Sequence, residues 1–300
     1  HISVGFFIFL IGSFVIGVAA TILQVVLNLY LTVCRIGKTT ALQRQMIGGT
    51  SNSIGMAIAP LVISYLIFHG TPLHDIVTKQ FIIPLIVLIL IMLIITLLVG
   101  KTQMPSIDNV REAPGEKFDK SVWSFRNLKL GVWGIFFYVG IEVAVGANVN
   151  MYASELGGSF ASNATHMAAL YWGLLLLGRF LGSFIKQVPS EKQLVIASIG
   201  AIVLLMLAML TANPWILTLI GFFHSIMWPA IFTLATDQLG KYTTKASGVL
   251  TMGVIGGGII PLLQGIFADV MGGNWLWTWL LVIAGEAYIL YYGLNGYKQH

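Results

Sequence analysis

In MWPAIFTLATDQLGKYTTKASGVLTMGVIGGGIIPLLQG (residues 227–265), two apolar segments flank a short basic hairpin. Glycines and a proline interrupt the second segment. A fainter copy occupies residues 28–60, where GMAIAP (55–60) repeats the Gly-x4-Pro spacing of GGGIIP (256–261). Both copies follow the same order, in which the end of an apolar segment, a hairpin with Lys and a segment rich in small residues succeed one another. This shared order predicts an internal duplication.

The composition excludes a soluble globular domain. Hydrophobic residues make up 57% of the chain and charged residues only 9%, and the mean hydropathy is +0.88. A helix needs roughly 20 apolar residues to cross a bilayer core of about 30 Å. Residues 81–99 supply such a run, broken only by Pro84 and Thr96. Strands of a membrane barrel would alternate apolar and polar residues, which this run does not. The sequence therefore predicts an all-α membrane protein.

Hydropathy marks nine apolar segments, which we interpret as transmembrane helices. They are residues 4–33, 46–68, 81–100, 128–156, 166–185, 194–211, 214–234, 246–270 and 275–294. The stretch between the third and fourth segments carries charges of both signs and two prolines. We therefore expect three helices of an N-terminal bundle in residues 1–100, a linker in residues 101–127 and a six-helix C-terminal bundle in residues 128–300.

The distribution of basic residues predicts the orientation. Every Lys and Arg except Lys79 falls in one alternating set of loops, which the positive-inside rule places in the cytoplasm. The linker and the C-terminus are then cytoplasmic, and we expect a multi-pass protein of the inner (plasma) membrane. The net charge of +5 follows from this topology, so we expect no nucleic-acid partner. With Cys34 as its single cysteine, the chain has no internal disulfide.

The duplication predicts the architecture. If segments 46–68 and 246–270 correspond, the first three segments pair with the last three, and the three between them have no partner. Two parallel six-helix repeats joined by a cytoplasmic linker are the architecture of major facilitator transporters. We therefore expect nine of twelve helices in this chain, which begins with His1, and three N-terminal helices before it.

Polar side chains inside membrane spans are expensive, so each is a functional candidate. They are Gln24, Asn28, Asn52, Glu142, Asn148, Asn150, His224, Gln264 and Glu286. Amides both donate and accept hydrogen bonds, which suits a hydroxyl-rich neutral solute such as a sugar. We therefore predict a substrate site of six residues: Gln24, Asn28, Asn52, Glu142, Asn150 and Gln264. The alternative is that the amides only join helices to one another.

Other candidates also have two interpretations. Glu142 is either a protonatable or cavity-lining group or a carboxylate paired with a neighbouring helix. His224 either titrates or packs with a hydrogen bond, and Glu286, without a polar neighbour on its own helix, is interpreted as structural. Arg179 either clamps a loop or anchors a helix end by snorkelling. Gly256, Gly257, Gly258 and Pro261 either let a helix bend during alternating access or allow tight static packing.

Five pieces of sequence together resemble the fucose/galactose/glucose:proton symporter family of the major facilitator superfamily. They are LQVVLNLYLTV (23–33), TSNSIGMAIAPL (50–61), FYVGIEVAVGANVN (137–150), ALYWGLLLLGRFLGS (169–183) and SIMWPAIFTLA through GGGIIPLLQG (225–265). The resemblance implies twelve helices in two bundles, a central hexose site with alternating access, and coupling to a cation, either proton or sodium.

The resemblance also implies roles for single positions. Gln24 stands where fucose-type members have Glu, and Glu142 matches an acidic residue of the family's seventh helix. His224 stands where Asn is usual, and Trp228 where Phe or Tyr is usual, so both are expected to tune the substrate. The family's first-helix coupling carboxylate would precede this chain.

Two other function classes are alternatives to sugar transport. An intramembrane enzyme is disfavoured because the sequence has no H-E-x-x-H or G-x-S-x-G motif and its intramembrane carboxylates are isolated. A transporter-like protein that no longer transports, such as a sensor or a truncated product, stays open as the alternative. We expect no cofactor, no metal and a monomer, and the sequence does not identify the sugar.

Overall fold

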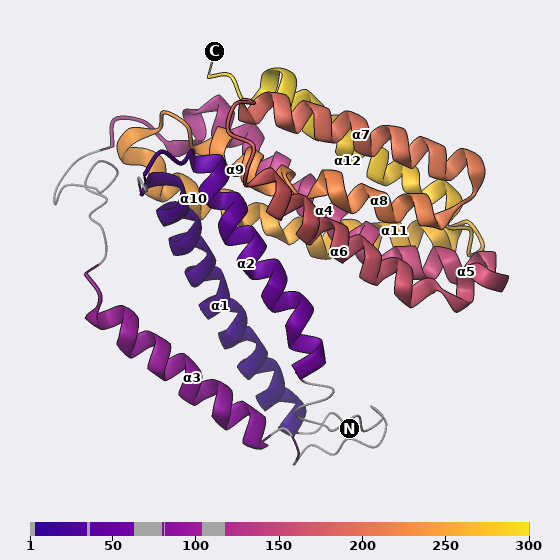
Figure 1. Cartoon of the computed structure of the whole chain (residues 1–300), viewed down its shortest axis with the longest axis horizontal. Helices are drawn as coiled ribbons and strands as arrows, with labels where there is room; N and C mark the ends of the chain where they lie inside the picture. Colours follow the sequence, from indigo (N-terminus) through magenta and orange to yellow (C-terminus); the bar gives the residue numbers. More distant parts are fainter. Residues whose placement is uncertain (1–3, 35–36, 63–79, 81, 104–117, 300) are drawn as a thin grey trace. The chain divides into compact units, whose positions relative to one another are not determined.

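The computed structural model describes residues 4–34, 37–62, 80, 82–103 and 118–299, with the backbone alone at 56, 57 and 59–61. In these ranges every regular element is helical (Figure 1). The chain divides into one compact unit of residues 1–50 and 107–300 and a second of residues 51–106. The division predicted from the sequence, at residues 100 and 127, stays a prediction.

The N-terminal helices begin where local signals place them. Helix α1 (Val4–Val33) has the predicted bounds, and α2 (Ala41–Leu61) starts five residues before the predicted segment. Thr40 explains the earlier start: its Oγ1 accepts from the Gln43 amide at 3.2 Å while Gln43 Oε1 accepts from the Thr40 amide at 3.1 Å. This is a capping box, T-x-x-Q. The end of the predicted segment 46–68 lies outside the described residues.

The α1–α2 hairpin is held by one buried arginine. Arg44 donates through Nε to the carbonyl oxygen of Leu31 and through Nη2 to that of Thr32, both at 2.7 Å. These carbonyls lie in the last turn of α1, where no helical amide follows to bind them. The first turn of α2 also reaches the C-terminal bundle, because Gln43 Nε2 donates to the Ser183 carbonyl at 2.8 Å.

In the second unit, α3 (Ile82–Lys101) is apolar along its whole length and has no buried residue. Its exposed Ile, Leu and Val side chains are what a lipid-facing helix presents to the bilayer. In the part of the chain that is described, six helical stretches, α3 among them, are long and apolar enough to cross a membrane. The predicted number of nine spans stays a prediction.

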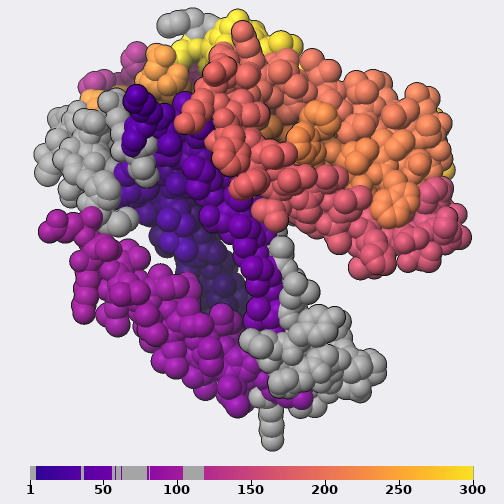
Figure 2. All heavy atoms as spheres, in the orientation of Figure 1, coloured from indigo at the N-terminus to yellow at the C-terminus, as the bar shows by residue number. Residues whose placement is uncertain are grey.

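The C-terminal bundle is built around one long helix, α4 (Figure 1). Its helices are α4 (Arg126–Leu156), α5 (Gly158–Ser162), α6 (Ala164–Gly182), α7 (Ser190–Thr211), α8 (Pro214–His224), α9 (Met227–Thr236), α10 (Thr243–Thr251), α11 (Gly256–Val270) and α12 (Trp279–Tyr291). Helix α4 contacts α6, α8, α9, α11 and α12, and Ile135, Tyr138 and Ile141 on it are fully buried. Figure 2 shows that α6, α7 and α8 form a continuous packed face.

Two of the predicted spans are interrupted inside the bundle. The predicted segment 214–234 is broken between α8 and α9 at Ser225 and Ile226, and segment 246–270 contains a 3-10 turn, η6 (Met252–Ile255), between α10 and α11. Pro229 accounts for the first break. A proline has no amide hydrogen, so it cannot bind the carbonyl four residues earlier, which is that of Ser225.

Two of the three predicted hinge glycines have a packing reason. A Cβ at Gly256 would collide with the backbone carbonyl of Phe136 on α4, and one at Gly257 would lie 2.9 Å from Val139 Cγ1. A Cβ at Gly258 would meet open space. Close helix approach therefore explains Gly256 and Gly257, and Pro261 lies inside α11. Whether this helix bends during function stays a prediction.

Candidate functional site

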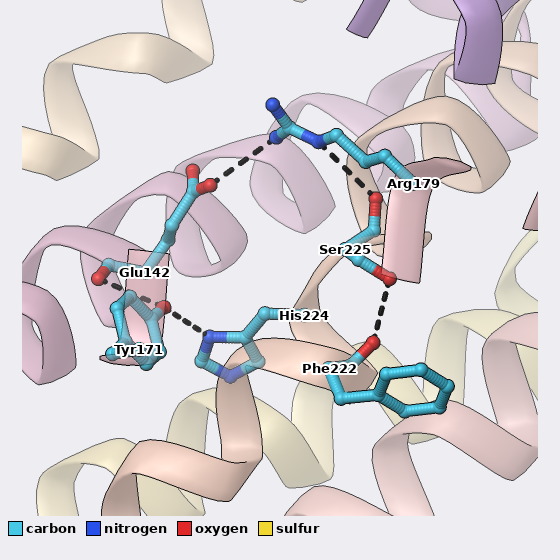
Figure 3. Close-up of polar contacts among 6 residues, drawn as sticks. All are labelled: Glu142, Tyr171, Arg179, Phe222, His224 and Ser225. Carbon is cyan, nitrogen blue, oxygen red and sulfur yellow. Dashed lines mark hydrogen bonds and ion pairs between the residues drawn. The ribbon is translucent and has the colours of Figure 1, made fainter. Parts of the chain in front are cut away.

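An arginine and a glutamate pair inside the C-terminal bundle. Arg179 Nη2 lies 3.3 Å from Glu142 Oε1, and the side chains are only 9% and 13% exposed (Figure 3). Arg179 lies in the last turn of α6, yet its guanidinium points into the bundle and not along the helix end toward water. The expectation of a snorkelling anchor is therefore wrong. Glu142 is therefore paired with a neighbouring helix, and its role in substrate binding stays a prediction.

Arg179 also binds the break between α8 and α9. Its Nε donates to the Ser225 carbonyl at 3.4 Å, the same carbonyl that Pro229 leaves without a helical amide. On its other side, the Arg179 Cδ is 3.2 Å from the position that a Cβ on Gly49 would take. One guanidinium thus joins α6, α4 and the α8–α9 break and packs beside α2. These contacts are made to a broken helix and not to a surface loop, and the predicted role of Arg179 as a clamp stays a prediction.

A second buried network starts one residue before Ser225. His224 is fully buried, with Nδ1 2.7 Å from the Tyr171 hydroxyl and Nε2 2.6 Å from Glu286 Oε1. Glu286, on α12, is also fully buried. The sequence interpretation missed the pairing of His224 with Glu286, because the two residues are 62 positions apart and helical spacing relates only residues of one helix.

Tyr171 brings the two networks within reach of each other. Its hydroxyl lies 3.1 Å from the backbone carbonyl of Glu142 as well as next to His224 (Figure 3). Sequence reasoning did not select Tyr171, since tyrosine is common in membrane helices and carries no signal of its own. Rings surround the group: Tyr138 is 6.2 Å from His224 and 6.5 Å from Trp228, centroid to centroid. Trp228 is half-buried and stacks on Phe232.

Gln264 connects three elements. It is fully buried, its Oε1 accepts from Asn148 Nδ2 on α4 at 2.9 Å, and its Nε2 donates to Thr278 Oγ1 at 3.0 Å. Thr278 ends the short 3-10 helix η7 (Leu276–Thr278). In this structure Gln264 therefore joins helices, as the alternative interpretation of the amides expects. Nearby on α4, the buried Oδ1 of Asn150 has no hydrogen-bond partner among the described residues.

The N-terminal candidates lie on α1 and α2. Asn28 is 8% exposed and Gln24 is half-buried one turn before it, so α1 presents both on one face. The Asn28 carbonyl accepts from Gln45 Nε2 at 2.9 Å. Asn52 lies on α2 in the second unit, where its side chain is exposed.

The structure thus brings together four candidates from the sequence, Glu142, Arg179, His224 and Glu286, and adds Tyr171. All of these groups are acid–base or hydrogen-bonding side chains held by apolar helices. Within the described ranges, no three His, Cys, Asp or Glu residues gather in a way that could hold a metal ion. The arrangement can bind hydroxyl groups and exchange protons.

Comparisons with known proteins identify the family. The model of the Major Facilitator Superfamily matches residues 2–261. A glucose/galactose transporter of Brucella abortus (strain 9-941) is 34% identical, over 97% of this chain and 72% of the relative. The L-fucose-proton symporter of Escherichia coli K12 is 26% identical, over 88% of this chain and 66% of the relative.

The fold comparison gives the same architecture. A crystal structure of the Major Facilitator Superfamily transporter FucP in the outward conformation superposes with a TM-score of 0.77. The alignment has 23% identity and covers 91% of this chain and 72% of FucP. At this identity the likeness supports the fold alone, and it confirms the predicted all-α transporter architecture. Since the family model covers most of the chain, this protein belongs to the Major Facilitator Superfamily.

Proposed function

We propose that the protein moves a hexose across the inner membrane by alternating access, in symport with a proton. The observation that carries the proposal is the convergence of Glu142, Arg179 and His224 inside a bundle whose outer side chains are apolar. Buried charges are expensive within a membrane and are retained where they bind or move something. The names of the relatives, a glucose/galactose transporter and an L-fucose-proton symporter, support a sugar and a proton.

The half-buried polar groups of α4 are the part of the site best suited to a sugar. Glu142 is 13% exposed, and Asn150 follows it eight residues later, a helical spacing that keeps the two near one face. A carboxylate accepts, and amides both donate and accept, so together they match the alternating donors and acceptors of sugar hydroxyls. The unpartnered Oδ1 of Asn150 would accept from such a hydroxyl.

From the other half of the chain, Gln24, Asn28 and Asn52 complete the proposed substrate site. In this account Gln264 acts first through Asn148, whose amide it orients, and reaches the sugar only when that hydrogen bond opens. Trp228 and His224 shape the apolar side of the site. Gly256, Gly257, Gly258 and Pro261 are proposed to let α11 move against α4, and Arg179 to hold the α8–α9 break.

The remaining parts of the proposal concern the oligomeric state, the membrane orientation, the coupling ion and the absence of catalysis. We propose a monomer in the lipid bilayer, with the linker and the C-terminus in the cytoplasm as the basic residues indicate. Proton and sodium coupling are separate hypotheses, and the name of the E. coli relative favours the proton. We propose no enzymatic activity and no cofactor.

Labelled-hexose uptake tests the proposal. Proteoliposomes holding the purified protein are offered glucose, galactose and fucose at two pH values, with and without sodium. We expect saturable uptake of at least one hexose, faster with an inward proton gradient and independent of sodium. Asn28→Ala and Glu142→Gln should each lose most of it. A folded wild-type protein that takes up no hexose would favour the alternative of a non-transporting sensor.

A further inference from the structure

We propose that His224 and Glu286 form a site that carries a proton during coupled transport, and that Tyr171 connects this site to the backbone of α4 at Glu142. The inference rests on the proposed function, because a coupling proton has meaning only if the protein transports a solute. It assigns a role to the most deeply buried titratable pair among the described residues. The two residues lie on different helices, α8 and α12, of the same bundle.

The pair is closed off from water on every side. Both side chains are 0% exposed, and the Nε2–Oε1 separation is 2.6 Å. The second carboxylate oxygen of Glu286, Oε2, is buried without a hydrogen-bond partner among the residues the structure describes. A carboxylate engaged on one oxygen only is a poor structural ion pair, since the desolvation of the other oxygen is not offset. An unpartnered carboxylate oxygen is instead expected in a carboxyl group, such as that of Glu286, that gains and loses a proton.

The hydrogen bonds of Tyr171 fit one protonation state of the pair. Its hydroxyl has one proton, yet it lies 2.7 Å from His224 Nδ1 and 3.1 Å from the Glu142 carbonyl oxygen. Both contacts are hydrogen bonds only if Nδ1 carries hydrogen and donates to the tyrosine oxygen, while the hydroxyl donates to the carbonyl. Since Nδ1 then holds its own hydrogen, a second proton lies between Nε2 and Glu286 Oε1. That is the protonated, electrically neutral form of the pair.

Loss of this proton would leave one net negative charge in a dry site and would remove one hydrogen bond. The titratable and charged groups that face the network are Tyr138 and Glu142 from α4 and Tyr171 and Arg179 from α6. Helix α9 has no titratable residue, and α7 has them only in its first turn, Glu191 and Lys192. Because Glu142 offsets the charge of Arg179, the deprotonated pair lacks a matching cation. The proton should therefore leave only when the bundle opens the pair to water.

The connection to the sugar runs through two short paths. Tyr171 joins His224 to the backbone of Glu142, the carboxylate proposed to bind sugar. The next residue after His224 is Ser225, whose carbonyl accepts from Arg179, the partner of Glu142. A shift of Glu142 on sugar binding would thus alter the hydrogen bonds of Tyr171 and the break beside His224. Proton affinity and sugar affinity would be coupled, and such coupling is reciprocal.

The test separates movement of sugar from movement of protons. Proteoliposomes are assayed for exchange of labelled against unlabelled hexose without any gradient, and for accumulation of hexose driven by a pH difference. At one proton per sugar, one pH unit supports about tenfold accumulation. Glu286→Gln keeps the size of the side chain but cannot release a proton. We expect this variant to exchange hexose and to accumulate none. Glu191→Gln, a carboxylate on the partly exposed start of α7, is the matched control and should do both.

Each result decides one question. Accumulation in Glu286→Gln equal to that of the wild type would overturn the proton site and leave the sugar-transport proposal standing. Absence of hexose exchange in the wild type would overturn sugar transport itself. A folded Glu286→Gln that has lost exchange as well would contradict the inference, since the variant mimics the protonated carrier. Should Glu286→Gln fail to fold, Tyr171→Phe keeps the pair. Exchange with a shifted pH dependence of uptake then supports the inference, and an unshifted dependence contradicts it.

Discussion

The bundle contains two acid–base pairs, Glu142–Arg179 and His224–Glu286, and they differ in access and in number of partners. The first is 13% and 9% exposed, and its arginine holds additional groups around the α8–α9 break. The second is 0% exposed on both members and leaves one carboxylate oxygen unpartnered. The first pair combines a permanent cation with an accessible carboxylate, which suits binding. The second combines two groups that can both lose charge, which suits carrying a proton.

The largest effect is expected from removing Arg179, the permanent positive charge of the first pair. Arg179→Ala leaves Glu142 buried without a cation and the Ser225 carbonyl without its donor. Breaking one partner of a buried pair costs about 3–5 kcal/mol, so we expect a large loss of folded protein and of hexose uptake. Thermal unfolding in detergent and uptake in proteoliposomes measure both. Arg179→Lys keeps the charge and should lose clearly less; an equal loss would indicate that shape and not charge matters at Arg179.

The second pair should tolerate removal of both partners better than removal of one. His224→Ala leaves Glu286 buried without its partner, at an expected loss of about 1–3 kcal/mol in unfolding free energy. In the double variant His224→Ala/Glu286→Ala the unpaired group is gone, so the losses should fall short of additivity by about 0.5–3 kcal/mol. Chemical unfolding of the four proteins in this cycle gives the coupling energy. Strict additivity would show that the two side chains do not interact in the folded protein.

Tyr171→Phe tests the connection between the two pairs. The hydroxyl makes contacts to His224 and to the Glu142 carbonyl, and its removal should lower the unfolding free energy by about 1 kcal/mol. The double-mutant cycle of Tyr171→Phe with His224→Ala should show coupling, whereas Tyr152→Phe, on the same bundle, should be additive with His224→Ala. Coupling of Tyr152 as strong as that of Tyr171 would remove the special role given to the connecting residue.

The smallest effect concerns the broken helix next to both pairs. Pro229→Ala restores an amide that can bind the Ser225 carbonyl, so the stability should change by less than about 1 kcal/mol. The informative variant is the double one, Pro229→Ala/Arg179→Ala. Once the Ser225 carbonyl has a helical amide, Arg179→Ala should lower the unfolding free energy by less. Comparing unfolding of the single and double variants checks this. An Arg179→Ala loss that is the same with either residue at 229 would mean that the Ser225 contact contributes nothing.

Much of the fold followed from periodicity and hydropathy, because a membrane helix carries its own signal. The bounds of α1 were predicted as the structure has them, and the all-α transporter architecture is confirmed. Departures arose at local signals that hydropathy does not register. The capping box at Thr40 starts α2 earlier, and Pro229 breaks a predicted single span. Thr40 and Pro229 can both be read from the sequence, and each explains one of the two departures.

The candidate site was predicted less completely. The expense of polar groups in a membrane selected Glu142, Asn150 and His224, and this rule needs no knowledge of partners. It could not show that Glu286 pairs with His224, because the contact joins two helices far apart in sequence. Which amides face a solute and which join helices is likewise decided by packing between helices, as Gln264 illustrates with its two protein partners.

Proton movement that accompanies hexose entry tests the account most directly. Proteoliposomes containing the protein are suspended in a weakly buffered medium, and the external pH is followed after hexose is added. The account predicts alkalinisation of the medium in step with uptake of labelled hexose, with no alkalinisation in Glu286→Gln and full alkalinisation in Glu191→Gln. Hexose entry that leaves the external pH unchanged in the wild-type protein would contradict it.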